Sequence, residues 1–233
     1  QPSQPSQPSQ PSQPSQPSQP SQPSQPSQPS QPSQPSQPSQ PSQPSQPSEP
    51  ELKFIDVNEG DWFYNSVMWA VKNGVTVGTT PTTFEPYTAC TRAQMIEFLW
   101  NAVGKPAATI KSVPFTDVPE SGSDDYWYED SLLWAYEAGI VAGTNDGSTF
   151  SPDQVCTRAE MISFIARLLS DGATADMPFV DVPASAWYYN EVQWAWANGL
   201  TVGTNDGTTF SPDNACIRAE AVEFLYNAFA EVE

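Results

Sequence analysis

Threefold internal repetition is the feature that most restricts what this chain can fold into. Units that begin at Phe54, Phe115 and Phe179 carry the same residue types in the same order. A unit of this size buries too little apolar surface to be stable alone, so the three units are expected to cover one another's apolar faces. The aligned positions are Asp56/Asp117/Asp181, Trp62/Trp127/Trp187, Trp69/Trp134/Trp194, Gly74/Gly139/Gly199, Gly78/Gly143/Gly203 and Phe84/Phe150/Phe210.

Each unit predicts two helices separated by a short extended piece and a turn. In the first unit a helix is expected from residues 61–62 onward, because Val67 and Ala70 begin an apolar face at helical spacing. Gly74 and its equivalents stand at the C′ position that ends a helix. The Asn-Asp-Gly at residues 145–147, repeated in the third unit and missing from the first, predicts a tight turn.

The second helix of each unit is expected to begin at an arginine motif, which reads CTRAQ from residue 90, CTRAE from 156 and CIRAE from 216. Thr157 is a good N-cap, and Glu160 can close a capping box, as Thr91 and Gln94 can in the first unit. Ile217 replaces the threonine in the third, which predicts a helix start weaker by ~1 kcal/mol. The sequence therefore predicts a mainly α fold of three helix-loop-helix repeats with short extended segments and hairpin turns.

Residues 1–48 repeat the triplet Gln-Pro-Ser without interruption. The segment offers no apolar side chain except proline, so it is expected to remain disordered and to favour polyproline II. At ~3.1 Å per residue it would act as a long, semi-rigid spacer. We expect a spacer over residues 1–50 and repeats over 51–106, 107–172 and 173–233.

Composition excludes several classes of function. The net charge of −19 makes nucleic acid and anionic membranes poor partners, and no apolar run is long enough for membrane insertion. The chain has no histidine, no nucleophile elbow and no phosphate loop, which predicts a protein that is not an enzyme. The absence of a starting Met and of a signal-peptide pattern predicts the mature or C-terminal part of a longer protein, with a cargo domain upstream.

The arginine of the motif admits two interpretations. Arg92, Arg158 and Arg218 fall in the first turn of a predicted helix, where the helix dipole disfavours a cation. One interpretation is an ion pair with a carboxylate of a neighbouring repeat, such as one of the repeated aspartates. The other is an anion site made of one guanidinium and free backbone N–H groups. Both hold if an acid orients the arginine while its other donors face outward.

Two columns of tryptophan follow the repeats. Trp69, Trp134 and Trp194 are assigned to the core. Trp62, Trp127 and Trp187 stand at the start of the first helix beside polar residues, where they are either core or a platform for the face of a sugar.

The order F-x-D-V, Trp, a helix ending in Gly, G-T-N-D-G-T-T-F-S-P and T-R-A-E resembles the S-layer homology (SLH) domain, over all three units. The resemblance implies a pseudo-threefold helical assembly that anchors an extracellular protein non-covalently at the cell wall or S-layer. It also implies a polysaccharide partner, the secondary cell wall polymer, an anionic glycan that often carries a pyruvate ketal on N-acetylmannosamine.

The family's site residues carry over to this chain by motif. The arginine that meets the ligand carboxylate in grooves between repeats corresponds to Arg92, Arg158 and Arg218. The residues near the groove correspond to Asp56, Asp117, Asp181, Trp62, Trp127, Trp187, Gly78, Gly143 and Gly203. Three grooves predict multivalent capture of a repetitive polymer. Departures at Gln94, Ile217 and the first turn predict unequal grooves, with the second closest to the family pattern.

Rival interpretations remain. Cys90, Cys156 and Cys216 are an odd set, expected as buried free thiols, and a zinc site would need a fourth ligand. No cofactor and no metal are predicted. The Asn-Asp-Gly turns suggest a calcium-binding module, but they lack the alternating acidic ligands of an EF-hand. The main alternative is a structural or protein–protein module of a surface lattice, without a glycan ligand.

Overall fold

The computed structural model describes residues 54–230, so the spacer predicted for residues 1–50 lies outside the described residues. This part is mainly helical, as predicted, and contains six α-helices and one short 3-10 turn, with no strand beyond isolated bridges. The elements are α1 (Tyr64–Lys72), α2 (Arg92–Ala102), α3 (Glu129–Glu137), η1 (Asn145–Gly147), α4 (Arg158–Leu169), α5 (Tyr189–Ala197) and α6 (Arg218–Phe229). None of these helices is long and apolar enough to cross a membrane.

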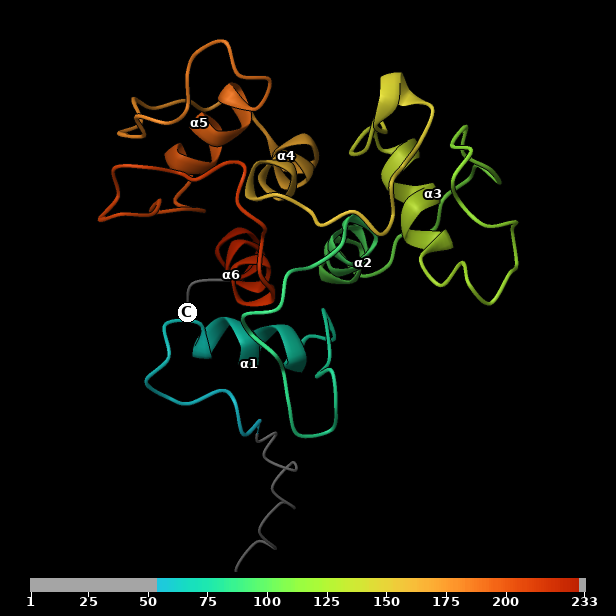
Figure 1. Cartoon of the computed structure of the whole chain (residues 1–233), viewed down its shortest axis with the longest axis horizontal. Coiled ribbons are helices and arrows are strands. Elements are labelled where there is room, and N and C mark those ends of the chain that lie inside the picture. The colour runs from blue at the N-terminus through green and yellow to red at the C-terminus, as the bar shows by residue number, and fades with distance from the viewer. Residues whose placement is uncertain (1–53, 231–233) are drawn as a thin grey trace, which may run out of the picture. The chain divides into compact units, whose positions relative to one another are not determined.

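The second helices of the three repeats form the centre of the fold. Helices α2, α4 and α6 contact one another and are seen nearly end-on in the middle of Figure 1. Each first helix packs outside the second helix of the preceding repeat, so that α3 lies on α2 and α5 lies on α4. Helix α1 packs on α6, which joins the first repeat to the last and closes the ring. No repeat therefore buries its own apolar faces by itself.

Three cysteines hold the centre together through their backbones. The amide of Cys156 donates to the carbonyl of Cys90 at 2.9 Å, that of Cys216 to Cys156 at 2.9 Å, and that of Cys90 to Cys216 at 3.1 Å. These three bonds make a closed cycle, in which each repeat donates to one neighbour and accepts from the other. All three cysteines are buried free thiols, as predicted. Burial raises the pKa of the Cys90 thiol to about 11, so the side chains act as small apolar groups.

The capping signals of the arginine motif act as predicted. Thr91 and Thr157 accept from the third residue of their helices, and the side chains of Gln94 and Glu160 return the bond to complete two capping boxes. Ile217 has no side-chain acceptor, so only the bond from its amide to Glu220 remains, at 3.2 Å. The helices begin at the arginines themselves.

The first helix of the first repeat begins later than the sequence predicts. Helix α1 starts at Tyr64 rather than at residues 61–62. The reason is local: Asp61 accepts the amide of Asn58 through its side chain at 2.7 Å, and its carbonyl accepts the amide of Tyr64 at 3.0 Å. These bonds build a turn ahead of the helix. Gly74 has a φ of +67° at the other end, which is the C′ conformation that the sequence predicts.

Candidate functional site

The motif arginine lies across a junction between repeats and is almost entirely buried. Arg92 donates through Nε to the carbonyl of Phe150 at 2.9 Å and through Nη1 to Glu160 Oε1 at 2.6 Å, and both acceptors belong to the second repeat. Its guanidinium lies over the rings of Phe150 and Phe164. We call this set the arginine clamp. The predicted pairing with an acid of a neighbouring repeat is confirmed here, with a glutamate in place of an aspartate.

The clamp recurs with one defect. Arg158 donates to Phe210 O at 2.9 Å and to Glu220 at 2.6 Å in the same way. Arg218 donates to Phe84 O and to Val77 O, each at 2.9 Å, and makes no ion pair among residues 54–230. The residue at the place of the glutamate is Gln94. The motif arginines are 4%, 4% and 6% exposed in chain order, so a substitution at any of them tests the fold as well as a ligand.

The repeated aspartates hold the backbone segments that accept the motif arginines. Asp117 accepts the amides of Phe150 and Ser151 at 2.8 and 2.7 Å. The Phe150 carbonyl then accepts Arg92, so the carboxylate positions the arginine of the preceding repeat through one peptide unit. Asp181 accepts the backbone amides of residues 210 and 211 in the same way, and Asp56 accepts those of residues 84 and 85. The structure therefore places the aspartates behind the clamps, bonded to backbone and making no ion pair with an arginine.

The repeated glycines are required by close packing. A Cβ at Gly143, where φ is +83°, would lie 2.6 Å from the Phe115 ring and 2.7 Å from the Thr149 carbonyl. Gly78 and Gly203 are crowded by the equivalent phenylalanines, Phe54 and Phe179. These contacts bring the backbone of the loop against the first residue of its own repeat. Gly143 also lines the pocket described below.

The two tryptophan columns differ in burial. Trp134 and Trp194 are buried, and Trp69 is partly buried against Tyr226. Trp62, Trp127 and Trp187 are 56%, 56% and 58% exposed. Each packs nearly perpendicular to the aromatic residue that follows it, and much of the indole stays exposed. The exposed column is therefore suited to contact with a ligand rather than to the core.

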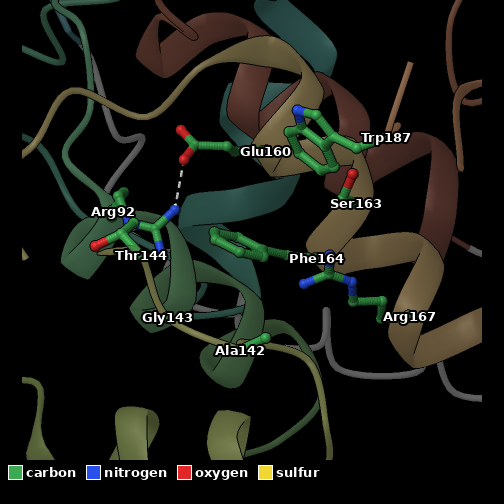
Figure 2. Close-up of a pocket in the computed structure, with 9 residues that line it drawn as sticks. All are labelled: Arg92, Ala142, Gly143, Thr144, Glu160, Ser163, Phe164, Arg167 and Trp187. Carbon is green, nitrogen blue, oxygen red and sulfur yellow. Dashed lines mark hydrogen bonds and ion pairs between the residues drawn. The ribbon is translucent and has the colours of Figure 1, made fainter. Parts of the chain in front are cut away.

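One pocket brings together predicted residues from all three repeats. It has a volume of about 190 Å³ and lies at the junction around Arg92. We call it the Arg92 pocket (Figure 2); it is lined by Arg92, Ala142, Gly143, Thr144, Glu160, Ser163, Phe164, Arg167 and Trp187. In Figure 2 the Arg92–Glu160 pair lies on one side, and Trp187 lies beside Ser163 on the other. The pocket offers guanidinium donors, a hydroxyl and an aromatic face, which suits an anionic, hydroxylated ligand.

The structure groups the predicted residues across repeats rather than within one. Arg92 from the first repeat meets Gly143 from the second and Trp187 from the third, while Asp117 lies behind the pocket. Sequence reasoning missed Arg167, which is the one arginine of the chain that stands outside the repeated motif. The signal that could have found it is its departure from asparagine, the residue at both equivalent positions, 101 and 227. Within residues 54–230 no cluster of three or more metal-ligating side chains is placed to hold an ion.

Comparison with known proteins supports the interpretation of the repeats. The sequence model described as the S-layer homology domain matches residues 53–96, 114–162 and 178–222. A cell surface protein of Thermoanaerobacter kivui is 35% identical over 133 residues, which is 54% of this chain and 16% of that protein. The surface-layer 125 kDa protein of Lysinibacillus sphaericus is 34% identical over 93 residues, 40% of this chain and 8% of the relative.

An enzyme is also among the relatives. An endoglucanase of Bacillus sp. (strain KSM-635) is 33% identical over 114 residues, 49% of this chain and 11% of the enzyme. The enzyme is matched through the repeats, which are a non-catalytic module. The chain spans less than a fifth of the length of each of these three relatives.

Proposed function

This chain belongs to the S-layer homology domain family, and we propose that it anchors a surface protein by binding an anionic secondary cell wall polymer. The bacterial cell wall and S-layer are its location. The observation that carries the proposal is the Arg92 pocket. Two guanidinium groups, a hydroxyl and an exposed tryptophan from three repeats line it together. A polymer end or side group that bears a carboxylate on a sugar matches these groups one by one.

The chemistry of the pocket supports a carboxylated sugar over a plain anion. A carboxylate such as a pyruvate ketal would accept from guanidinium N–H groups, which bind it more strongly than neutral donors do. The apolar face of the sugar ring would lie on the free indole face of Trp187. The Ser163 hydroxyl is buried and donates to the carbonyl of Ala159 at 2.8 Å, so Thr144 is the hydroxyl that faces the ring substituents. A free phosphate or sulfate would use the arginines but leave the tryptophan without a partner.

The small share of each relative that this chain covers supports a modular role. In those proteins the repeats are a minor part of a longer chain. We propose that an upstream cargo domain is held away from the wall by the Gln-Pro-Ser segment, while the three repeats provide attachment. Attachment without a covalent bond requires no catalytic group.

The test is co-sedimentation of the chain with purified Gram-positive cell walls, before and after the secondary polymer is removed. We expect binding to intact walls and little binding to stripped walls. Trp187→Ala removes an exposed side chain at little cost to the fold, and it should weaken sedimentation. Val180→Ala is the matched control, because Val180 belongs to the same repeat, is 83% exposed and lies outside the pocket.

Other outcomes would contradict the proposal. Equal sedimentation with intact and stripped walls would show that the secondary polymer is not the ligand. No sedimentation with either, combined with self-assembly that grows with protein concentration, would favour the lattice module instead.

A further inference from the structure

The Arg92 pocket differs from its two counterparts at the positions that set its charge. In α4 the pocket is lined by Ser163 and Arg167. The equivalent residues of α2 are Glu97 and Asn101, and those of α6 are Glu223 and Asn227. A hydroxyl and a cation at one junction thus correspond to a carboxylate and a neutral amide at the other two.

The structural role of Arg167 needs only an asparagine. Its Nη1 donates to the carbonyl of Ile140, just beyond the end of α3, at 2.9 Å. Asn101 makes the equivalent bond to Val75 at 3.0 Å, and Asn227 to Leu200 at 3.3 Å. The other donors and the positive charge of Arg167 are therefore surplus to the fold. A basic residue in the last turn of α4 also suits the helix dipole, but this effect does not account for the serine one turn earlier.

The charge of Arg167 is not compensated within the pocket. The charge of Arg92 is neutralised by Glu160, which contacts it at 2.6 Å. Arg167 is exposed and makes no ion pair among residues 54–230; Glu191 shares a second pocket with it but does not line the Arg92 pocket. In Figure 2 it lies across the Phe164 side chain from Arg92, in the same pocket. The pocket therefore carries one excess positive charge.

The other two junctions carry either an excess of negative charge or no excess charge. At the Arg158 junction the clamp is neutralised by Glu220, and Glu223 adds a second carboxylate. At the Arg218 junction Gln94 is neutral, and the acids that interact with Arg218 are Glu85 and Asp56. Glu97 stands where the Arg92 pocket has Ser163, and it interacts with Lys105 and with a further acid, Asp130. The Arg92 pocket would attract a ligand carboxylate. The Arg158 and Arg218 junctions would repel it or exert no net attraction.

We propose that the Arg92 pocket, rather than the second groove that the motif alone favours, is the dominant anion site of this chain, and that Arg167 and Ser163 determine this preference. The inference rests on the proposed function and narrows it: the three junctions are structurally alike, but one takes the carboxylated sugar. The other two junctions bind uncharged parts of the polymer or only stabilise the fold. Arg167 donates to the ligand carboxylate. Ser163, whose buried hydroxyl donates to the Ala159 carbonyl at 2.8 Å, keeps uncharged the position where a glutamate would repel the ligand.

The experiment exchanges residues between junctions, so every loss and transfer substitution is one that the fold already holds at an equivalent place. Binding is measured by calorimetry on the whole chain, with the methyl glycoside of N-acetylmannosamine bearing a pyruvate ketal and with the same sugar lacking it. Arg167→Asn and Ser163→Glu are the loss variants. Glu223→Ser combined with Asn227→Arg is the transfer variant, and Asn227→Ala is the matched control at the weak junction.

The wild type should bind the ketal sugar at one site and the neutral sugar much more weakly. Loss of one charge-assisted contact predicts a roughly 10-fold or greater rise in Kd for Arg167→Asn. Ser163→Glu should raise the Kd as well, because its carboxylate repels that of the ligand. Asn227→Ala should leave the Kd unchanged. The transfer variant should raise the stoichiometry from one site to two. Unchanged melting temperatures would exclude misfolding as the cause.

Two failures can be told apart. Wild-type binding at three equal sites, or binding that Arg167→Asn leaves unchanged, refutes the dominant pocket while the proposed function stands. A wild type that binds neither the ketal sugar nor intact walls refutes the proposed function, and the inference falls with it.

Discussion

The defective clamp around Arg218 should be repairable by one substitution, Gln94→Glu. Glu160 shows why a glutamate is needed there: its Oε1 accepts Arg92 while its Oε2 accepts the amide of Thr157. Gln94 has a single acceptor oxygen, which already takes the amide of Thr91 at 3.0 Å. Its other terminus is an NH₂ group, which cannot accept from Arg218. Glutamate would keep the capping bond and add the missing ion pair.

The magnitude follows from the type of contact. A hydrogen bond to a charged group stabilises by about 1.5–3 kcal/mol and a neutral one by about 0.5–1.5 kcal/mol. The glutamates of the two intact clamps are only 14% and 20% exposed, so part of the gain is offset by desolvation. We therefore expect Gln94→Glu to raise the free energy of unfolding by about 1 kcal/mol. For a folded part of this size the melting temperature should rise by about 2–4 °C.

The assay is thermal and urea unfolding of four proteins: the wild type, Gln94→Glu, Arg218→Gln and the double variant. Glutamate in the first turn of α2 also interacts with the helix dipole, which contributes about 0.3–1 kcal/mol without any arginine. The cycle separates the two effects, because only the ion pair requires Arg218. Equal stabilisation by Gln94→Glu with and without Arg218 would refute the reasoning. The reverse change, Glu160→Gln, should destabilise by a similar amount.

Three further outcomes can be measured by unfolding and thiol chemistry. Ile217→Thr should restore the N-cap of α6 and raise the free energy of unfolding by ~1 kcal/mol in urea melts, whereas no gain would mean that the apolar side chain compensates. Because burial raises the pKa of Cys90 to about 11, the folded protein should not react with a thiol reagent at pH 8, and its stability should fall as the pH rises from 9 toward 11; rapid labelling of the native state would contradict this. Burial also raises the pKa of Glu97 above 4.5, so its contribution to stability is complete below that pH and is lost as the pH rises through the folded pKa. Glu97→Gln should remove that dependence and stabilise the protein at pH 7, and an unchanged pH profile would show that solvent screens the group.

The local structure of the second helices follows from short segments of sequence. Each begins at its arginine because a threonine or isoleucine in extended conformation precedes it and an acid or amide three residues later bonds back. These interactions span at most a few residues, so the spacing alone reveals them. The same holds for Gly74, whose positive φ ends α1. The start of α1 was less predictable, because Asp61 serves as well in a turn as in a helix.

The amino-acid sequence by itself determined the repeats, the starts of the second helices and the presence of three arginine motifs, since each depends on neighbours in the chain. Only the tertiary structure decided which repeats meet. Arg92 contacts Glu160, 68 residues away, and Arg218 contacts Val77, 141 residues away, because α1 packs on α6 and closes the ring. Nothing in one repeat specifies this exchange of partners. For the same reason the sequence could name Trp187 and Arg92 separately, but only the folded ring places them in one pocket with Arg167, where their charges and faces act together.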